Sequence, residues 1–299
     1  MSCHTPSRKE RRKKEKKEKD EASARFLASL ATDGDRARVN SARAPHASSW
    51  LMPRPFEDDV DGWLRATEFQ ALVRLRLGLP QHGAEDGQPC QLCHGKSIAD
   101  AMGRHSLTCL SSGLRAQVHN DVRDVIHRLA ATALLQPRRE ALCFPPLSLR
   151  TDVLLTRVPR QPIAVDVAVT HLDSSGSFAA AAKDPAGAAT AYEGNKLAKY
   201  GALALGARVS LMPCVFDTHG ACSASGMELL RFIAREWGRQ FDLRPCRSVP
   251  LVMQRVTTTL MRGIARLLCA NGSAAGVSSS AAFFSPGGRP STARENAAA

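Results

Sequence analysis

The feature that most restricts the fold of this 299-residue chain is a long amphipathic segment followed by two short apolar runs. Apolar residues recur in steps of three and four from Leu114, which predicts one helix running to about Leu135. Residues 151–158 and 163–170 are the apolar runs, and the prolines between them favour a β-hairpin. A helix that buries one face beside a hairpin predicts an α/β layer arrangement.

The segments on either side extend this pattern. Residues 186–205 are expected to form a helix, residues 208–216 a third strand, and residues 226–240 and 249–269 two further helices. The expected core over 113–270 is therefore a helix, a β-hairpin, a helix, a strand and then helix. Upstream, helical spacing begins near residue 60 and ends at Gly78, a typical stop signal.

A cluster of metal-ligand residues precedes this core. Cys90, Cys93, His105 and Cys109 follow the spacing Cys-x2-Cys-x11-His-x3-Cys. Thiolate and imidazole are the ligands that tetrahedral zinc prefers, and His105 and Cys109 lie one helical turn apart. His94 is a competing ligand, and four unrelated residues are the alternative interpretation. The sequence favours a zinc knuckle over residues 89–112.

Two aspartates occupy the predicted hairpin. Asp166 interrupts an apolar strand, where a carboxylate is costly to bury without a partner. If the turn centres near residue 160, Asp152 lies opposite Ala168 and Asp166 is its diagonal neighbour. Both carboxylates then share one face about 7–8 Å apart, a separation suited to a shared Mg²⁺ ion. The alternative is one aspartate at a strand end and one in a salt bridge.

The predicted helix over 186–205 carries further polar residues. Glu193, Lys196 and Tyr200 stand at positions i, i+3 and i+7, which places them on one helical face. A lysine beside a metal would orient the attacking water or stabilise a charged phosphate. An ordinary Glu–Lys surface pair with a tyrosine at the core rim is the alternative.

Taken in order, these motifs resemble a known region. A Cys-Cys-His-Cys knuckle, a His-Asn pair, an Asp-x13-Asp hairpin and a Glu-x2-Lys-x3-Tyr helix look like the restriction-like endonuclease region of site-specific non-LTR retrotransposon polyproteins, a branch of the PD-(D/E)XK nucleases. The resemblance covers roughly residues 46–245. The matching residues are Cys90, Cys93, His105, Cys109, His119, Asn120, Asp152, Asp166, Glu193, Lys196 and Tyr200.

The resemblance implies a restriction-endonuclease-like fold and metal-assisted hydrolysis of DNA phosphodiester bonds. Asp152 and Asp166 would hold catalytic Mg²⁺, and the knuckle would hold structural Zn²⁺. Lys196 would stabilise the negative charge that develops on the phosphate. Glu193 would be a further metal ligand or would support Lys196, and Tyr200 would be a catalytic residue. Glu140, at the end of the long helix, is a weaker candidate ligand. The expected nucleic-acid contacts are His119, Asn120 and Lys199.

The sequence departs from that family at three positions. Thr151 stands where the family usually has a proline, and Val118 where it usually has an arginine. Ala168 stands where many nucleases have a lysine, and in this branch Lys196 on the following helix is expected to replace it. No reverse transcriptase fits before Trp50, so we expect a detached endonuclease module. The alternative is a catalytically inactive nucleic-acid-binding protein with the same fold.

Charge and cysteine content bear on partners and compartment. The net charge is +13, and residues 1–45 contribute +6 through 13 Lys or Arg and 7 Asp or Glu. This balance favours a nucleic acid as the partner. The resemblance implies DNA, with RNA as the alternative. Nine scattered cysteines and a charged start argue against secretion, and no apolar run suits a membrane span. We expect a nuclear or cytoplasmic protein.

The expected domain organisation has five parts. Residues 1–45 form a basic disordered arm, 46–88 a helical linker segment, 89–112 the zinc knuckle, and 113–270 the endonuclease-like domain. Residues 271–299 are rich in serine, glycine and alanine and are expected to be a disordered tail.

Overall fold

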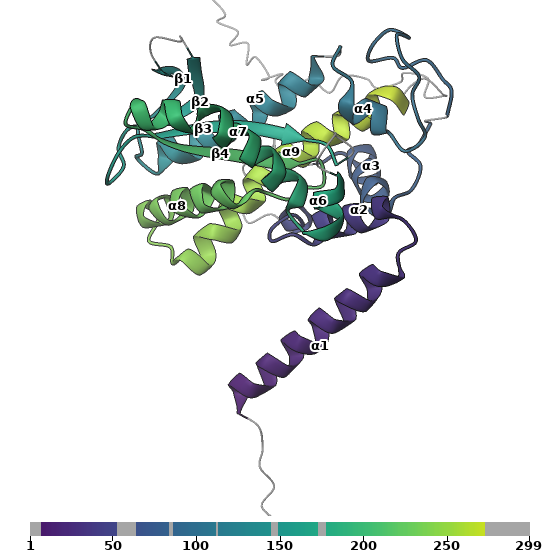
Figure 1. Ribbon diagram of the computed structural model, residues 1–299, viewed down its shortest axis with the longest axis horizontal. Helices are drawn as coiled ribbons and strands as arrows, with labels where there is room; N and C mark the ends of the chain where they lie inside the picture. Colours follow the sequence, from purple (N-terminus) through teal and green to yellow (C-terminus); the bar gives the residue numbers. More distant parts are fainter. Residues whose placement is uncertain are drawn as a thin grey trace, which may run out of the picture.

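The computed structural model describes residues 7–52, 64–83, 86–111, 113–144, 149–172 and 178–272 (Figure 1). The predicted tail over 273–299 lies outside these residues, as do residues 60–63 of the predicted helical spacing. In chain order the elements are α1 (Arg8–Ser29), α2 (Asp33–Arg43), η1 (Ser49–Leu51), α3 (Ala66–Leu77), α4 (Arg104–Thr108), α5 (Leu114–Thr132), β1 (Pro137–Phe144), β2 (Leu149–Leu155), β3 (Ile163–Thr170), α6 (Phe178–Lys183), α7 (Gly187–Gly206), β4 (Ser210–Asp217), α8 (Ala224–Gln240) and α9 (Pro245–Gly272).

A four-stranded mixed sheet organises these elements, in the order β1-β2-β3-β4. The pairs β1–β2 and β2–β3 are antiparallel, and β4 runs parallel to β3. Helices α6 and α7 make the crossover that a parallel pair requires. The predicted hairpin, crossover helix, third strand and two final helices are therefore present, which confirms a mixed α/β fold.

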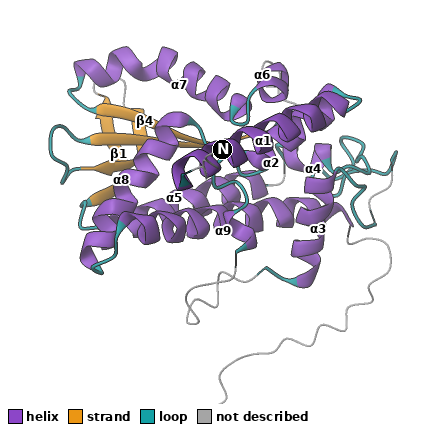
Figure 2. Ribbon diagram, turned by 90° about the horizontal axis from the view of Figure 1, so that it is seen from below, coloured by secondary structure: helices purple, strands orange, loops and turns teal. Residues whose placement is uncertain are grey.

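The sheet lies between two helical layers (Figure 2). Val165 and Val167 of β3 face a core built with α5, α8 and α9, whereas Ala164 and Ala168 face the α7 side. Because side chains alternate along a strand, Asp166 belongs to the α7 side. The crossing of α5 and α9 is close: a Cβ atom added at Gly263 would lie 2.8 Å from a methyl carbon of Val118.

The strand β1 differs from the sequence prediction. The long amphipathic helix ends at Thr132 rather than near Leu135, and residues 137–144 form an edge strand that was not predicted from the sequence. Glu140, expected at the helix end, is therefore a strand residue, and it has a positive φ of 49°. The prediction of its position was wrong because charged residues dilute the alternation that marks a strand.

Two helices, α1 and α2, lie within residues 7–45 of the predicted arm. Helix α1 is exposed along its length and projects from the rest of the molecule (Figure 1). Helix α2 is part of the folded body, because Ala37 is fully buried and the Asn40 side chain donates hydrogen bonds to the Ala181 and Ala182 carbonyls at 3.1 and 2.9 Å. The expectation of a disordered arm therefore does not fit α2.

The predicted linker over 46–88 also contributes to the core. Leu72 of α3 and Trp50 of η1 are buried in the same cluster as α5 and α9. Helix α3 ends as expected at Gly78, whose φ of 67° is the left-handed conformation that favours glycine at a helix end. Within the described part of the chain, the helices are all too short or too polar to cross a bilayer.

Candidate functional site

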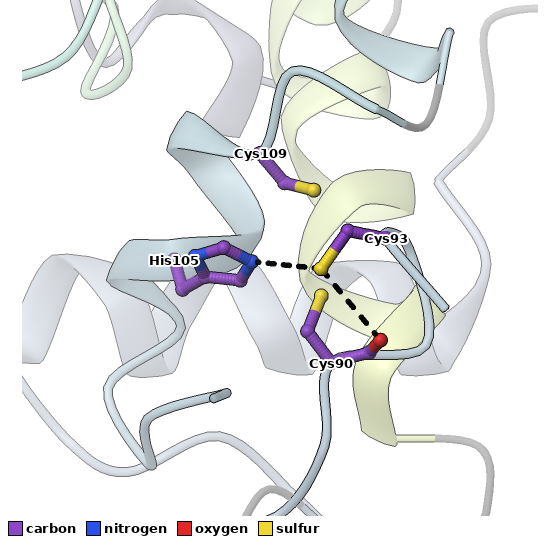
Figure 3. A group of neighbouring side chains, drawn as sticks. All are labelled: Cys90, Cys93, His105 and Cys109. Atoms are coloured by element: carbon purple, nitrogen blue, oxygen red, sulfur yellow. Dashed lines mark hydrogen bonds between the residues drawn. The ribbon is translucent and has the colours of Figure 1, made fainter. Parts of the chain in front are cut away.

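The Cys-Cys-His-Cys motif forms a compact cluster (Figure 3). The ligand atoms of Cys90, Cys93, His105 and Cys109 all lie within 4.8 Å of one another, and the three thiols are buried. The Cys93 Sγ atom is 3.6 Å from the His105 Nε2 atom. The competing ligand His94 is exposed and outside the cluster. Three thiols and one imidazole suit tetrahedral zinc, so these residues could bind such an ion.

Two segments hold the ligands in place. Cys90 and Cys93 lie on a turn that is closed by a hydrogen bond from the Gly95 amide to the Cys90 carbonyl at 2.8 Å. His105 belongs to α4, and Cys109 is the C-cap of that helix. The carboxylate of Asp100 accepts hydrogen bonds from the amides of Arg104 and His105 at 3.0 and 2.7 Å, which fixes the start of α4.

Asn271, near the end of α9, supports the cluster from behind. Its amide nitrogen lies 3.4 Å from Cys90 Sγ and 2.7 Å from Ser106 Oγ, and its oxygen accepts from the Gln91 amide at 2.8 Å. Burial raises the pKa of the Cys90 thiol, but hydrogen bonds from Asn271 and the Cys93 backbone outweigh burial and lower it. Asn271 therefore favours the thiolate, the form that binds a metal.

A cleft of about 500 Å³ opens beside the sheet. Its wall comes from the first turns of α5, from β2, β3 and α7, and from the C-terminal half of α9. The charged and polar side chains that line it are Arg115, His119, Arg150, Thr151, Asp152, Asp166, Thr170, His171, Tyr192, Lys196, Tyr200 and Thr218. Three residues proposed from the sequence, Asp152, Asp166 and Lys196, thus meet in one cleft.

The strand register brings the two aspartates together. The pairing of β2 with β3 ends at Val153 opposite Val165, and this register, continued by one residue, would bring Asp152 opposite Asp166. The sequence prediction put Ala168 opposite Asp152, which is wrong by two residues. The predicted face was nevertheless correct, because a register shift of two residues leaves a side chain on the same face of a sheet. In the observed register both aspartates therefore belong to the same face of the sheet.

Asp152 is fixed by two donors. Its Oδ2 atom accepts a hydrogen bond from the Val167 amide at 2.6 Å and lies 3.3 Å from the Nε2 atom of His119. The hydrogen bond to Asp152 raises the pKa of His119, although burial opposes this effect. His119, expected to contact nucleic acid, therefore also contacts one of the two cleft carboxylates.

Asp166 forms an ion pair with Lys196. The Lys196 Nζ atom lies 3.0 Å from Asp166 Oδ2 and 3.1 Å from Oδ1. Burial raises the pKa of Asp166, and the Lys196 ammonium offsets only part of this rise. Burial works against the charge on Lys196, yet the Asp166 carboxylate outweighs burial and raises the pKa of Lys196. The Tyr192 and Tyr200 rings flank the ammonium at 5.9 and 5.8 Å.

Two proposed carboxylates lie elsewhere. Glu193 is buried and accepts a hydrogen bond from the Ser225 amide at 3.1 Å, at the start of α8, and it does not line the cleft. Glu140 forms an ion pair with Arg123 at 2.7 Å and is likewise outside the cleft lining. The structure thus gives Glu193 and Glu140 other partners than a shared metal or Lys196.

The remaining proposed nucleic-acid contacts are peripheral. The side-chain oxygen of Asn120 lies 3.3 Å from the His119 Nδ1 atom, so Asn120 contacts His119 rather than the cleft space. Lys199 is exposed and its ammonium lies 5.0 Å from the centre of the Tyr200 ring. Tyr200 itself lines the cleft, as proposed.

Several residues that line the cleft were not predicted from the sequence. Tyr192 lies four residues before Lys196, so helical spacing could have placed both on one face. Arg115 and Arg150 come from α5 and β2, and no spacing rule links them before the fold is known. His171 follows β3 directly, where strand ends often carry functional groups.

The chain was compared with protein-family models and with curated proteins. No protein-family model matches the chain, and no curated protein matches it significantly. The cleft and the cysteine cluster are therefore the features of this molecule that indicate a function.

Proposed function

We propose that the cleft is the active site of a metal-dependent nuclease that hydrolyses DNA phosphodiester bonds. The observation that carries the proposal is that Asp152, Asp166 and Lys196 line one cleft. Two facing carboxylates are the oxygen donors that Mg²⁺ prefers, so the residues present fit this ion. The order of helix, hairpin, helix, strand and helix also supports a PD-(D/E)XK-like core of the retrotransposon type.

Bound Mg²⁺ would supply a polarised phosphate and a water of lowered pKa. The side chains of the protein would orient the ion and stabilise the charge on the phosphate. Asp152 is held by Val167 and His119, so its carboxylate stays oriented. The Lys196 ammonium lies 5.9 and 5.8 Å from the centres of the Tyr192 and Tyr200 rings, and in this proposal it stabilises the negative charge that develops on the phosphate.

The alternative is a nucleic-acid-binding protein without catalysis. One observation favours it: Lys196 and Asp166 already neutralise each other through an ion pair. A cleft in which this pair persists would bind a polyanion through its arginines and cut nothing. Zinc in the knuckle would have a structural role in both cases.

Nicking of supercoiled plasmid separates these functions. The purified chain is expected to convert supercoiled DNA to open circles with Mg²⁺ and not with a chelator. The Lys196→Ala variant is expected to lose this activity, whereas Lys183→Ala, an exposed lysine outside the cleft, keeps it. DNA binding without any Mg²⁺-dependent nicking would favour the inactive binder.

A further inference from the structure

The zinc knuckle is also a wall of the cleft. Leu107 lies in α4 between the ligands His105 and Cys109, and its buried side chain lines the cleft. One residue further on, the Thr108 carbonyl accepts a hydrogen bond from the Arg115 guanidinium at 3.2 Å. Arg115, in the first turn of α5, therefore joins the knuckle to the cleft that it lines.

The charges of the cleft point to an anion near Arg115. Asp152 contacts His119, and Asp166 pairs with Lys196, so both carboxylates have a basic partner. Arg115 and Arg150 also line the cleft, but no carboxylate of the described residues lies within 4.0 Å of either guanidinium. Two positive charges are left for a ligand that carries negative charge.

We propose that Arg115 binds a backbone phosphate of the nucleic acid next to the cleavage position, and that the zinc knuckle holds it there. This inference rests on the proposed nuclease function. A guanidinium has five N–H donors. One is used on Thr108, and the others can grip phosphate oxygens in a fork geometry.

In the same geometry the knuckle positions Arg115. Thr108 directly precedes the ligand Cys109, and its carbonyl belongs to the last turn of the short helix α4. A metal bound by His105 and Cys109 would fix that turn and hence the acceptor for Arg115. Lysine could not replace Arg115 fully, because an ammonium lacks the planar fork that serves both partners.

The test is fluorescence anisotropy with a short labelled DNA duplex, without Mg²⁺ so that nothing is cut. Arg115→Ala is expected to weaken binding about 5- to 10-fold at low ionic strength and to lower the salt slope by about one. Arg115→Lys is expected to recover only part of the loss. The matched control is Arg128→Ala, an exposed arginine about 20 Å further along α5, which should bind as the unmodified chain does.

Removal of zinc completes the experiment. A zinc chelator is expected to weaken binding by the unmodified chain and to add little to the loss in Arg115→Ala, because both changes act on one contact. Circular dichroism of each sample checks that the fold remains. If the two losses add in full, Arg115 does not depend on the knuckle and that half of the proposal is wrong.

The outcomes also separate this inference from the nuclease proposal. If Arg115→Ala and Arg128→Ala bind DNA equally well while the unmodified chain nicks plasmid, Arg115 is no phosphate contact and the nuclease proposal stands. If the unmodified chain neither binds nor nicks DNA, both proposals fail.

Discussion

The ammonium of Lys196 lies 3.0 Å from the carboxylate of Asp166, so the cleft holds its lysine and one of its acids as a pair. A cation that binds Asp166 must compete with this ammonium. We therefore expect Lys196→Ala to bind Mg²⁺ no more weakly than the unmodified chain, yet to nick DNA about 100- to 1000-fold more slowly, because charge on the phosphate is no longer stabilised. Nicking rates across a Mg²⁺ series test this, and full rescue at high Mg²⁺ would contradict it.

Asp166→Asn is expected to abolish nicking while DNA binding is kept or slightly strengthened. The amide keeps the shape of the carboxylate but removes the charge that a hard cation needs, together with repulsion against phosphate. The fold should persist, because a neutral amide costs less to bury. Asp242→Asn, at an exposed position outside the cleft, is the control. Nicking at the rate of the unmodified chain would make Asp166 a structural residue.

The cysteine cluster predicts one zinc ion per chain. Elemental analysis of the purified protein is expected to give a ratio near one, and Cys93→Ser to lower it, because a hydroxyl is a poorer zinc ligand than a thiolate. The control is Cys246→Ser, since Cys246 is exposed and outside the cluster. Absence of zinc from protein prepared in its presence would refute the site.

Asn271→Ala is expected to weaken zinc binding about 10- to 100-fold, the range typical of residues that support metal ligands. The change removes the hydrogen bond to Cys90 and the tie to Ser106. Competition with a zinc chelator measures the affinity, and Gln240→Ala, an exposed amide at the end of α8, is the control. An unchanged affinity together with a lowered melting temperature would show that Asn271 only stabilises the fold.

Truncation should distinguish α1 from α2. Removing residues 1–29 is expected to weaken DNA binding, most at low salt, and to leave the melting temperature unchanged, since α1 is exposed and carries most of the arm's charge. Removing residues 1–45 should also destabilise the protein, because Asn40 then no longer binds the Ala181 carbonyl. Thermal unfolding of both forms checks this, and equal melting temperatures would contradict it.

Acid should destabilise the protein through His219. Burial lowers the pKa of His219 from 6.5 to about 3. Below pH 6.5 the unfolded chain therefore binds a proton at this histidine while the folded chain does not, so the free energy of unfolding falls as the pH is lowered from 6.5 toward 3. The neighbouring Asp217, whose pKa burial raises to about 6, acts in the opposite direction. Comparison with His219→Gln cancels the Asp217 effect. The unfolding free-energy difference between the two proteins should shrink by about 1.4 kcal/mol per pH unit below pH 6.5 in urea titrations. A constant difference would contradict it.

The sequence was most informative where periodicity was strong. The hairpin, α7 and α8 follow from it. Asp152 and Asp166 were placed on one face of the sheet even with a wrong register, because an error of two residues does not change the face to which a side chain points. It failed at β1, an edge strand whose charged residues hide the period of two. It also failed for Glu193, because helical spacing defines which residues share a face but not how that face is rotated toward the sheet.

The N-terminal helices were unpredictable for another reason. Helix α2 buries small residues such as Ala37 and Ala42 rather than large ones, so its sequence looks polar. Its burial depends on α6, more than 130 residues away, and the composition of α2 itself does not indicate that it packs on this helix. The cluster of Cys90, Cys93, His105 and Cys109 was easier to predict, because residue type and spacing alone indicate a candidate metal site.

The 28 residues of α9 have a consequence for biosynthesis. This last helix packs on α3, α4, α5 and α8, and Asn271 near its end reaches the Cys90 turn. Almost the whole described chain must therefore emerge from the ribosome before the hydrophobic core can form. Contacts this distant in sequence make folding slow, and a chain that stops short of α9 would expose the apolar faces of α5 and α8 to aggregation.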